Sequence, residues 1–183
     1  MKNNGQNHKL FHSFCLYPNV KFETQENKEN VILVLRAHPI TQIYWLLNSL
    51  FFIFILSLLN YFFPSFFNAT QIFFLNVFAI VFILSYLWLN FLNWFFNVGV
   101  ISNKRIIDID FHGIIYKEVT ATHLNKIEDI TSKGGGYFQS FFDYGNVFIQ
   151  TAGTEANIEF IDVPYPSQVA TMINELIGKK YGH

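Results

Sequence analysis

The first residues with types and spacing suited to chemistry are His8, His12 and Cys15, because imidazole and thiolate groups are common zinc ligands. The two histidines are four residues apart, so they would share one face if the segment were helical. Only three ligands are present, and the paired Cys-x-x-Cys pattern of strong zinc sites is missing. A polar tail explains these side chains more simply, and the sequence predicts no metal and no cofactor.

A catalytic site would need a nucleophile beside a base, paired carboxylates or a metal-binding set. His112 and His123 are far apart and flank predicted strand turns, without an acidic partner at short spacing. Asp108 and Asp110 alternate with apolar residues, so we expect both to face solvent. The sequence therefore does not predict an enzyme.

A glycine-rich stretch, Gly134, Gly135 and Gly136, follows Lys133. Such loops bind phosphate when a strand precedes them and a helix N-terminus follows. Here an aromatic segment and then a predicted strand follow, and neither nucleotide-binding motif is present. We expect a flexible turn.

Five aromatic residues follow the glycines: Tyr137, Phe138, Phe141, Phe142 and Tyr144. Three of them, the phenylalanines, have the spacing of one helix face, and the preferred interpretation is that this face packs beneath a sheet. The alternative is an exposed apolar surface for a partner or for the membrane.

The element that dominates the chain is a run of 67 residues, between Arg36 and Lys104, without Lys, Arg, Asp or Glu. A helix that crosses a bilayer needs about 20 apolar residues. The run has room for two such helices, which we place at residues 43–63 and 72–93. The short loop 64–71 makes them antiparallel neighbours, so the sequence predicts a transmembrane hairpin.

The basic residues around the hairpin predict its orientation, because Lys and Arg accumulate in cytoplasmic flanks. They lie on both sides of the hairpin and not in its loop: Lys2, Lys9, Lys21, Lys28, Arg36, Lys104 and Arg105. We therefore expect a multi-pass protein of the cell membrane with both termini in the cytoplasm. Residues 1–30 would form a polar cytoplasmic tail, and residues 31–42 a juxtamembrane segment.

Four polar residues inside the spans predict how the two helices contact each other: Ser49, Asn60, Asn76 and Asn90. In an antiparallel hairpin, Asn60 and Asn76 fall at the outer end, and Ser49 and Asn90 at the inner end. Hydrogen bonds between such helices contribute about 0.6–2 kcal/mol each. A polar conduction path is the alternative, but it lacks the charged groups that transporters normally use.

Residues 94–180 change character and predict a small α+β domain. Alternating apolar residues predict strands at 107–111, 114–120, 127–132, 146–151 and 158–163. After Pro166, apolar residues recur with the helical period, which predicts an amphipathic helix. Ser167 would be its N-cap, and Gly178 would end it.

Several segments resemble the membrane-anchored bacterial pleckstrin-homology (PH)-like family, in which transmembrane helices precede the PH-like module. The similarity runs through residues 22–178 and is carried by these stretches: 22–39, 101–107, 123–130, 137–147 and 151–153. It implies a bent antiparallel sheet or barrel of about seven strands, capped by the C-terminal helix, which is two strands more than the pattern shows. The expected fold is a transmembrane hairpin followed by this α+β PH-like domain. The resemblance implies no activity.

The resemblance also directs attention to Lys104, Arg105 and Lys117, because PH domains that bind lipid headgroups use clustered cations near their first strands. Residues 94–183 nevertheless hold seven Lys and Arg against ten Asp and Glu, a net charge of −3. This charge disfavours an anionic membrane surface. Lys104 and Arg105 more simply mark the exit from the second span.

We therefore expect a membrane-anchored, non-enzymatic binding or scaffolding protein that presents its PH-like domain at the inner leaflet. Its partners would be the lipid bilayer and another membrane or cytoplasmic protein, or a second copy of itself. The net charge of −1 does not indicate nucleic-acid binding. Two alternatives stay open: a sensor of lipid headgroups, and an accessory subunit of a transport or pore assembly.

Overall fold

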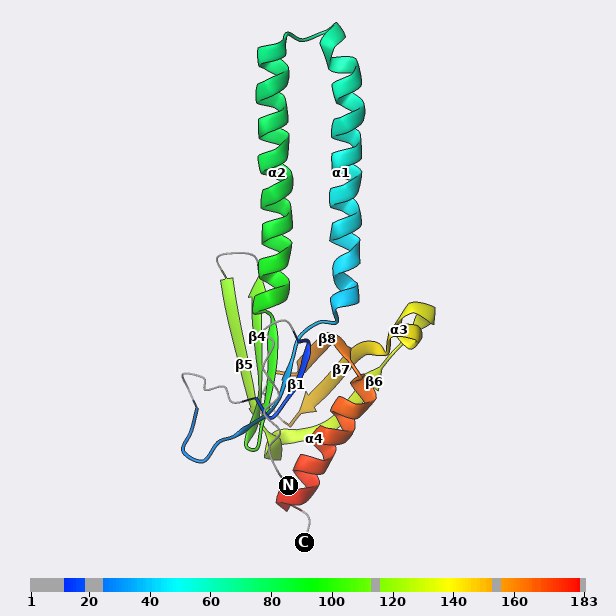
Figure 1. The fold of residues 1–183 in the computed structure, drawn as a ribbon. Coiled ribbons are helices and arrows are strands. Elements are labelled where there is room, and N and C mark those ends of the chain that lie inside the picture. Colours follow the sequence, from blue (N-terminus) through cyan, green and yellow to red (C-terminus); the bar gives the residue numbers. More distant parts are fainter. Residues whose placement is uncertain (1–11, 19–24, 113–115, 153–155, 182–183) are drawn as a thin grey trace. The chain divides into compact units, whose positions relative to one another are not determined.

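The computed structural model describes residues 12–18, 25–112, 116–152 and 156–181 (Figure 1). The chain forms two compact units. One, the sheet domain, combines residues 1–39 with 95–183, and the other, the helical hairpin, contains residues 40–94.

The helical hairpin consists of two long helices, α1 (Ile43–Phe62) and α2 (Ala69–Phe96). The short 3-10 helices η1 (Pro39–Gln42) and η2 (Phe63–Ser65) precede and follow α1. Both long helices are long and apolar enough to cross a membrane, and almost none of their most apolar stretch is buried. A core helix of a soluble domain would instead bury these side chains.

Helix α2 begins three residues before the predicted start because Asn68 and Gln71 cap it. The Asn68 side chain accepts a hydrogen bond from the Gln71 amide, and the Gln71 side chain accepts one from the Asn68 amide, each 3.0 Å long. This reciprocal pair is a capping box, which satisfies two amides that the first turn leaves without partners. Helix α1 matches its predicted range within one residue.

The sheet domain contains two antiparallel sheets. The first has five strands in chain order, β1 (Phe14–Leu16), β2 (Val31–Leu35), β3 (Val98–Ser102), β4 (Arg105–His112) and β5 (Tyr116–His123). The second has β6 (Ile127–Lys133), β7 (Tyr144–Thr151) and β8 (Ile158–Pro164). Three short or helical elements complete the domain: η3 (Leu124–Lys126), α3 (Gly136–Phe142) and α4 (Pro166–Tyr181).

The pattern-based prediction missed β1, β2 and β3. We expected residues 31–42 to be a juxtamembrane segment and the domain to begin at 94, but Leu33 and Leu35 of β2 are fully buried in its core. Strand β2 pairs with β3, with Leu35 opposite Gly99. The hairpin therefore does not precede the domain. It is an insertion between two neighbouring strands of one sheet.

The core joins both sheets and one face of α4. Val169 and Ile173 of α4 are fully buried, as the helical period predicts, and α4 packs on β6 and β7. Each such side chain contributes about 1.5–3 kcal/mol by leaving water. The predicted helix ends are wrong: α4 begins at Pro166 and continues through Gly178 to Tyr181. Proline suits the first helical position, where an amide would have no helical partner.

Candidate functional site

The sheet domain has two polar regions, one at each end of β3. Asn97 and Gly99 border the first at the start of the strand, and Ser102 begins the second at its end. Five residues of strand separate these ends by roughly 15 Å. Of the predicted site residues, Lys104 and Arg105 belong to the second region, and none lines the first.

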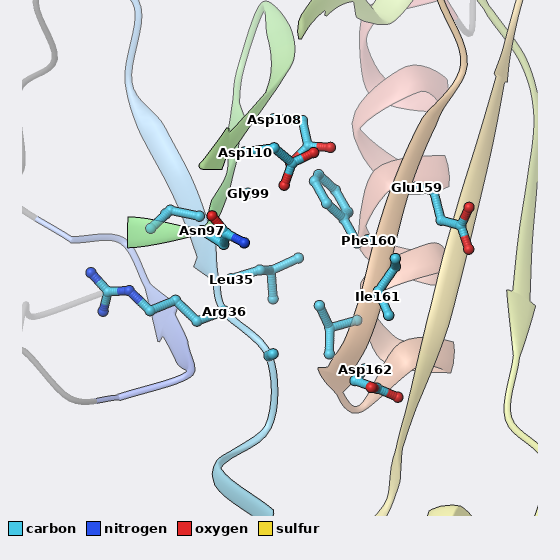
Figure 2. Close-up of a pocket in the computed structure, with 13 residues that line it drawn as sticks. Leu35, Arg36, Asn97, Gly99, Asp108, Asp110, Glu159, Phe160, Ile161 and Asp162 are labelled. Carbon is cyan, nitrogen blue, oxygen red and sulfur yellow. The ribbon is translucent and has the colours of Figure 1, made fainter. Parts of the chain in front are cut away.

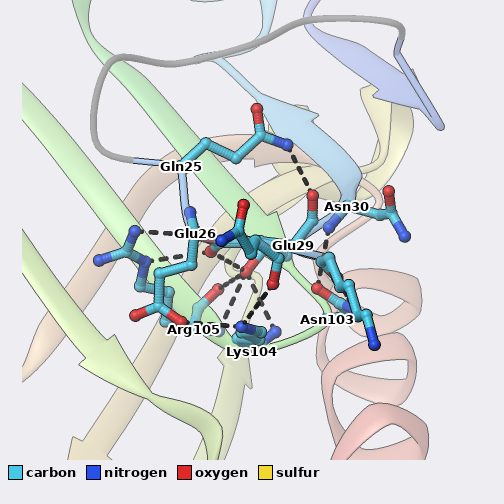
Figure 3. Close-up of polar contacts among 10 residues, drawn as sticks. Gln25, Glu26, Glu29, Asn30, Asn103, Lys104 and Arg105 are labelled. Carbon is cyan, nitrogen blue, oxygen red and sulfur yellow. Dashed lines mark hydrogen bonds and ion pairs between the residues drawn. The ribbon is translucent and has the colours of Figure 1, made fainter.

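The region at the end of β3 is an ion-pair cluster, the Glu29 network, made of Glu26, Glu29, Ser102, Lys104 and Arg105 (Figure 3). The Glu29 carboxylate is fully buried and accepts hydrogen bonds from Arg105 Nε at 3.0 Å and Nη2 at 3.1 Å. Ser102 Oγ and the Glu26 amide donate two more, at 2.7 and 2.9 Å. Burial acts to raise the pKa of Glu29, but these donors outweigh it, and the pKa lies below its usual value.

Two of the three cations considered for binding a lipid headgroup are already paired with carboxylates in this network. Lys104 Nζ lies 2.8 Å from Glu26 Oε2, and Arg105 pairs with Glu29. Lys117 does not join them: it lies opposite Phe111 on β4, whereas Arg105 lies opposite His123, six residues along β5. Six residues of strand are about 20 Å. The three cations do not converge, and β3 separates Lys104 and Arg105 from the end of α2.

The region at the start of β3 is a cavity of about 280 Å³, the acidic pocket (Figure 2). Four carboxylates line it: Asp108, Asp110, Glu159 and Asp162. Figure 2 shows Asp108 and Asp110 next to each other, beside the ring of Phe160. The Phe160 ring packs directly against Gly99. A Cβ at that position would lie only 2.5 Å from the ring, so any other residue there would displace it.

The expectation that Asp108 faces solvent is wrong. Burial, the largest cause, and the neighbouring charges of Asp110 and Glu118 together raise its pKa to about 7, against the lowering effect of one backbone hydrogen bond from Ile109. Burial also raises the pKa of Asp162. The alternating pattern correctly places Asp108 and Asp110 on one face of β4, but β8 borders that face, and no local pattern could show this.

Asp162 connects the acidic pocket to the residues that precede the hairpin. Its amide donates a 2.9 Å hydrogen bond to Asn146 Oδ1, and its carbonyl accepts a 2.7 Å bond from the His38 amide. The His38 ring stacks on Tyr144 with centroids 5.5 Å apart. The start of β7 and the end of β8 are thereby held beside the segment from which the chain leaves the sheet domain.

The aromatic segment forms α3, and three of its side chains are almost fully exposed: Tyr137 (95%), Phe138 (73%) and Phe141 (81%). We call these three residues the aromatic face. The expectation that Phe138, Phe141 and Phe142 pack beneath the sheet is wrong, because all three are exposed, Phe142 least; Tyr144, the last residue of the aromatic segment, is buried. Helical spacing correctly groups the aromatic side chains, but it cannot show whether another element covers them.

The polar residues of the helical hairpin behave in two ways. The side-chain amides of Asn60 and Asn76 exchange two hydrogen bonds of 2.7 Å between α1 and α2. Ser49 and Asn90 instead donate to the carbonyls of Trp45 and Tyr86 in their own helices, each at 2.8 Å. Contact between the helices by amide hydrogen bonds is therefore concentrated at the end near the loop.

The residues considered for zinc are only partly described. His8 lies outside the described residues, His12 is exposed and Cys15 belongs to β1. Within the part of the chain that the structure describes, no group of three His, Cys, Asp or Glu side chains could hold a metal ion.

Comparison with known proteins gives one match. The family model of the bacterial PH domain matches residues 31–177, from the start of β2 to the last turns of α4. The matched range includes the hairpin as well as the strands on both sides of it. No curated protein and no solved structure matches the chain.

Proposed function

The chain belongs to the bacterial PH domain family, and from this premise we propose that it is a membrane-anchored, non-enzymatic binding protein. A PH-like domain is a non-catalytic binding fold. We propose that the helical hairpin inserts in the cell membrane and that the sheet domain lies at the cytoplasmic face, where it binds another protein.

The observation that carries this proposal is the insertion of an apolar two-helix hairpin between the paired strands β2 and β3. Paired strands must lie on one side of a membrane, and two crossings return the chain to the side from which it left. A spanning hairpin is thus compatible with an intact sheet domain, whereas a single crossing would separate β2 from β3. The basic residues on both flanks favour the cytoplasmic side.

A protein partner is favoured by the exposed edge of the five-stranded sheet. Among the described strands, β5 pairs only with β4, and its residues Tyr116 and Val119 are large, apolar and exposed. An edge strand of this kind offers backbone donors and acceptors for an added strand. Anchoring in a membrane raises the effective concentration of any neighbouring partner, so a weak contact suffices.

The two alternatives receive less support. A headgroup sensor would need free, convergent cations, but Lys104 and Arg105 are paired with Glu26 and Glu29. A pore or transport subunit built from several hairpins would need polar contacts between copies. Asn60 and Asn76 already satisfy each other within one hairpin.

Two measurements test the proposal on the full chain. It should stay in the membrane pellet after alkaline extraction, and release into the supernatant would contradict anchoring. A photo-crosslinking residue at Tyr116 or Val119 should capture a discrete protein partner in cells, whereas one at Glu175, exposed on α4, should not. Equal capture at all three positions would contradict a docking edge at β5.

A further inference from the structure

The aromatic face of α3 combines three exposed rings with a complete lack of charge. From Gly134 to Phe142 the sequence is Gly-Gly-Gly-Tyr-Phe-Gln-Ser-Phe-Phe, without an acidic or basic residue. Tyr137 and Phe141 are one helical turn apart and Phe138 lies beside them, so all three share one side of α3. Rings exposed to this degree are costly in water, which indicates that something apolar covers them.

The residue that follows α3 contacts the segment that leads into the first predicted span. Asp143, which ends α3, accepts a 2.8 Å hydrogen bond from the Tyr165 amide through its carbonyl. The next residue, Tyr144, stacks on His38. Only the four residues of η1 separate His38 from the first residue of α1. Five Cα steps reach at most about 18 Å, so the chain tethers His38, on which Tyr144 stacks, within that distance of the first residue of α1.

We propose that the aromatic face, formed by Tyr137, Phe138 and Phe141, inserts in the lipid–water interface of the same membrane that the hairpin spans. This inference rests on the proposed function, because it needs the hairpin in the bilayer. Tyrosine is favoured at this depth because its ring contacts acyl chains while its hydroxyl reaches water, and phenylalanine rings bury apolar area at the boundary between headgroups and acyl chains. Gln139 and Ser140, the two polar side chains of α3, would remain in the headgroup region.

The absence of charge on α3 selects the kind of lipid contact. A surface that reads anionic headgroups would present Lys or Arg, and its binding would weaken with salt. The nearest flanking cation, Lys133, has its Nζ 4.6 Å from the ring centroid of Phe148 on β7. The proposed contact is therefore apolar, and it should be independent of both anionic lipid and ionic strength.

The experiment uses the full chain in nanodiscs with one cysteine for a polarity-sensitive fluorophore. Cys15→Ser removes the native thiol, and Ser140→Cys places the label on α3 while all three rings stay in place. Lys126→Cys in η3, at the other end of β6, is the matched control, and Phe54→Cys in α1 reports insertion of the hairpin. Quenching by nitroxide-labelled lipid is compared with quenching by iodide in the aqueous phase.

We expect the label at 140 to be quenched several-fold more by the nitroxide lipid than the label at 126, and several-fold less by iodide. Serine at Tyr137, Phe138 and Phe141 together should abolish this difference, and the rings are exposed enough for the fold to tolerate the change. Neutral and anionic lipids should give the same result.

Other results would overturn the inference. Iodide access at 140 equal to that at 126, with lipid quenching at 54, would leave the hairpin inserted and the aromatic face in water. Lipid quenching at 140 that persists after the triple serine change would show that the three rings do not make the membrane contact. Protection only in discs with several copies would assign the face to a second copy of the chain. Absence of lipid quenching at 54 would refute membrane anchoring itself.

Discussion

At the two ends of β3, carboxylates removed from water have pKa values shifted in opposite directions. At one end, Glu29 is buried among an arginine, a hydroxyl and an amide, and its pKa is lowered. At the other, Asp108 is partly buried beside a second carboxylate, and its pKa is raised to about 7. Burial opposes the charged form in both places, so the partners decide the sign.

This difference assigns different roles to the two regions. The Glu29 network joins residues 26–30, before β2, to the turn between β3 and β4, and therefore holds together strands that the hairpin separates in sequence. In the acidic pocket no Lys or Arg among the described residues forms a salt bridge with Asp108 or Asp110. The first region stabilises the fold, and the second costs stability at neutral pH.

The largest expected effect comes from Glu29→Gln. The amide keeps the shape of the carboxylate but removes the buried negative charge that Arg105 Nε and Nη2 bind, which should lower the free energy of unfolding by about 3 kcal/mol. Cys15 provides the readout. Its strand, β1, pairs with β2, so the Cys15 thiol should become more reactive toward an alkylating reagent when the sheet unfolds. The urea midpoint for Cys15 labelling should fall, and an unchanged midpoint would mean that the network is dispensable.

Asp108→Asn should have the opposite sign, and only above acidic pH. The folded pKa of about 7 exceeds the unfolded value near 3.8, so the folded state binds this proton more tightly. Its contribution to stability is fully present below pH 3.8 and is lost as the pH rises through 7. We expect Asn to raise the free energy of unfolding by about 1–2 kcal/mol at pH 8, after allowance for solvent screening, and to have little effect near pH 4. A gain that does not depend on pH would contradict the raised pKa.

Asp110→Asn sharpens the same comparison. It removes the like charge beside Asp108, so the pKa of Asp108 should fall toward its ordinary value. Adding Asp108→Asn to this background should then stabilise by less than in the native protein, with a difference of roughly 0.5–1 kcal/mol at pH 8. Glu159→Gln, at an exposed position of the same pocket, serves as the control. Equal gains in both backgrounds would show that burial alone raises the pKa.

The smallest effect is expected for Lys104→Ala. Its partner Glu26 is solvent-exposed, although the ion pair lowers the pKa of that carboxyl. Exposed pairs contribute little to stability, so the urea midpoint for Cys15 labelling should not change measurably. A loss of unfolding free energy as large as that of Glu29→Gln would mean that the exposed Lys104–Glu26 pair stabilises the domain as much as the buried Glu29 carboxylate does.

The periodicity of apolar residues predicted those helices and strands whose own sequence carries a clear repeat. The two apolar helices, the amphipathic α4 and the strands β4 to β8 follow from residue periodicity, with their ends shifted by a few residues. Strands β1 to β3 were missed because they are short and because the hairpin separates β2 from its partner β3. The apolar run of β2, buried on both faces, was the available signal.

For the candidate sites too, the local sequence does not show which distant segments surround a side chain. Alternation placed Asp108 and Asp110 on one face, and helical spacing grouped the rings of α3, but the cover over each face depends on distant segments. Lys104 and Arg105 were recognised as a basic pair, whereas their acidic partners Glu26 and Glu29 lie more than 70 residues earlier. Sequence identified the groups, and only the structure showed what surrounds them.

The most direct test of the account is the side of the membrane on which each part of the chain lies. Single cysteines at Ser65, in the hairpin loop, and at Lys126, in the sheet domain, would be introduced after Cys15→Ser and exposed to a membrane-impermeant maleimide in intact cells. We predict that the cysteine at 65 is labelled from outside and that the cysteine at 126 is labelled only after permeabilisation. Labelling of both from outside, or of neither, would contradict a spanning hairpin that anchors a cytoplasmic PH-like domain.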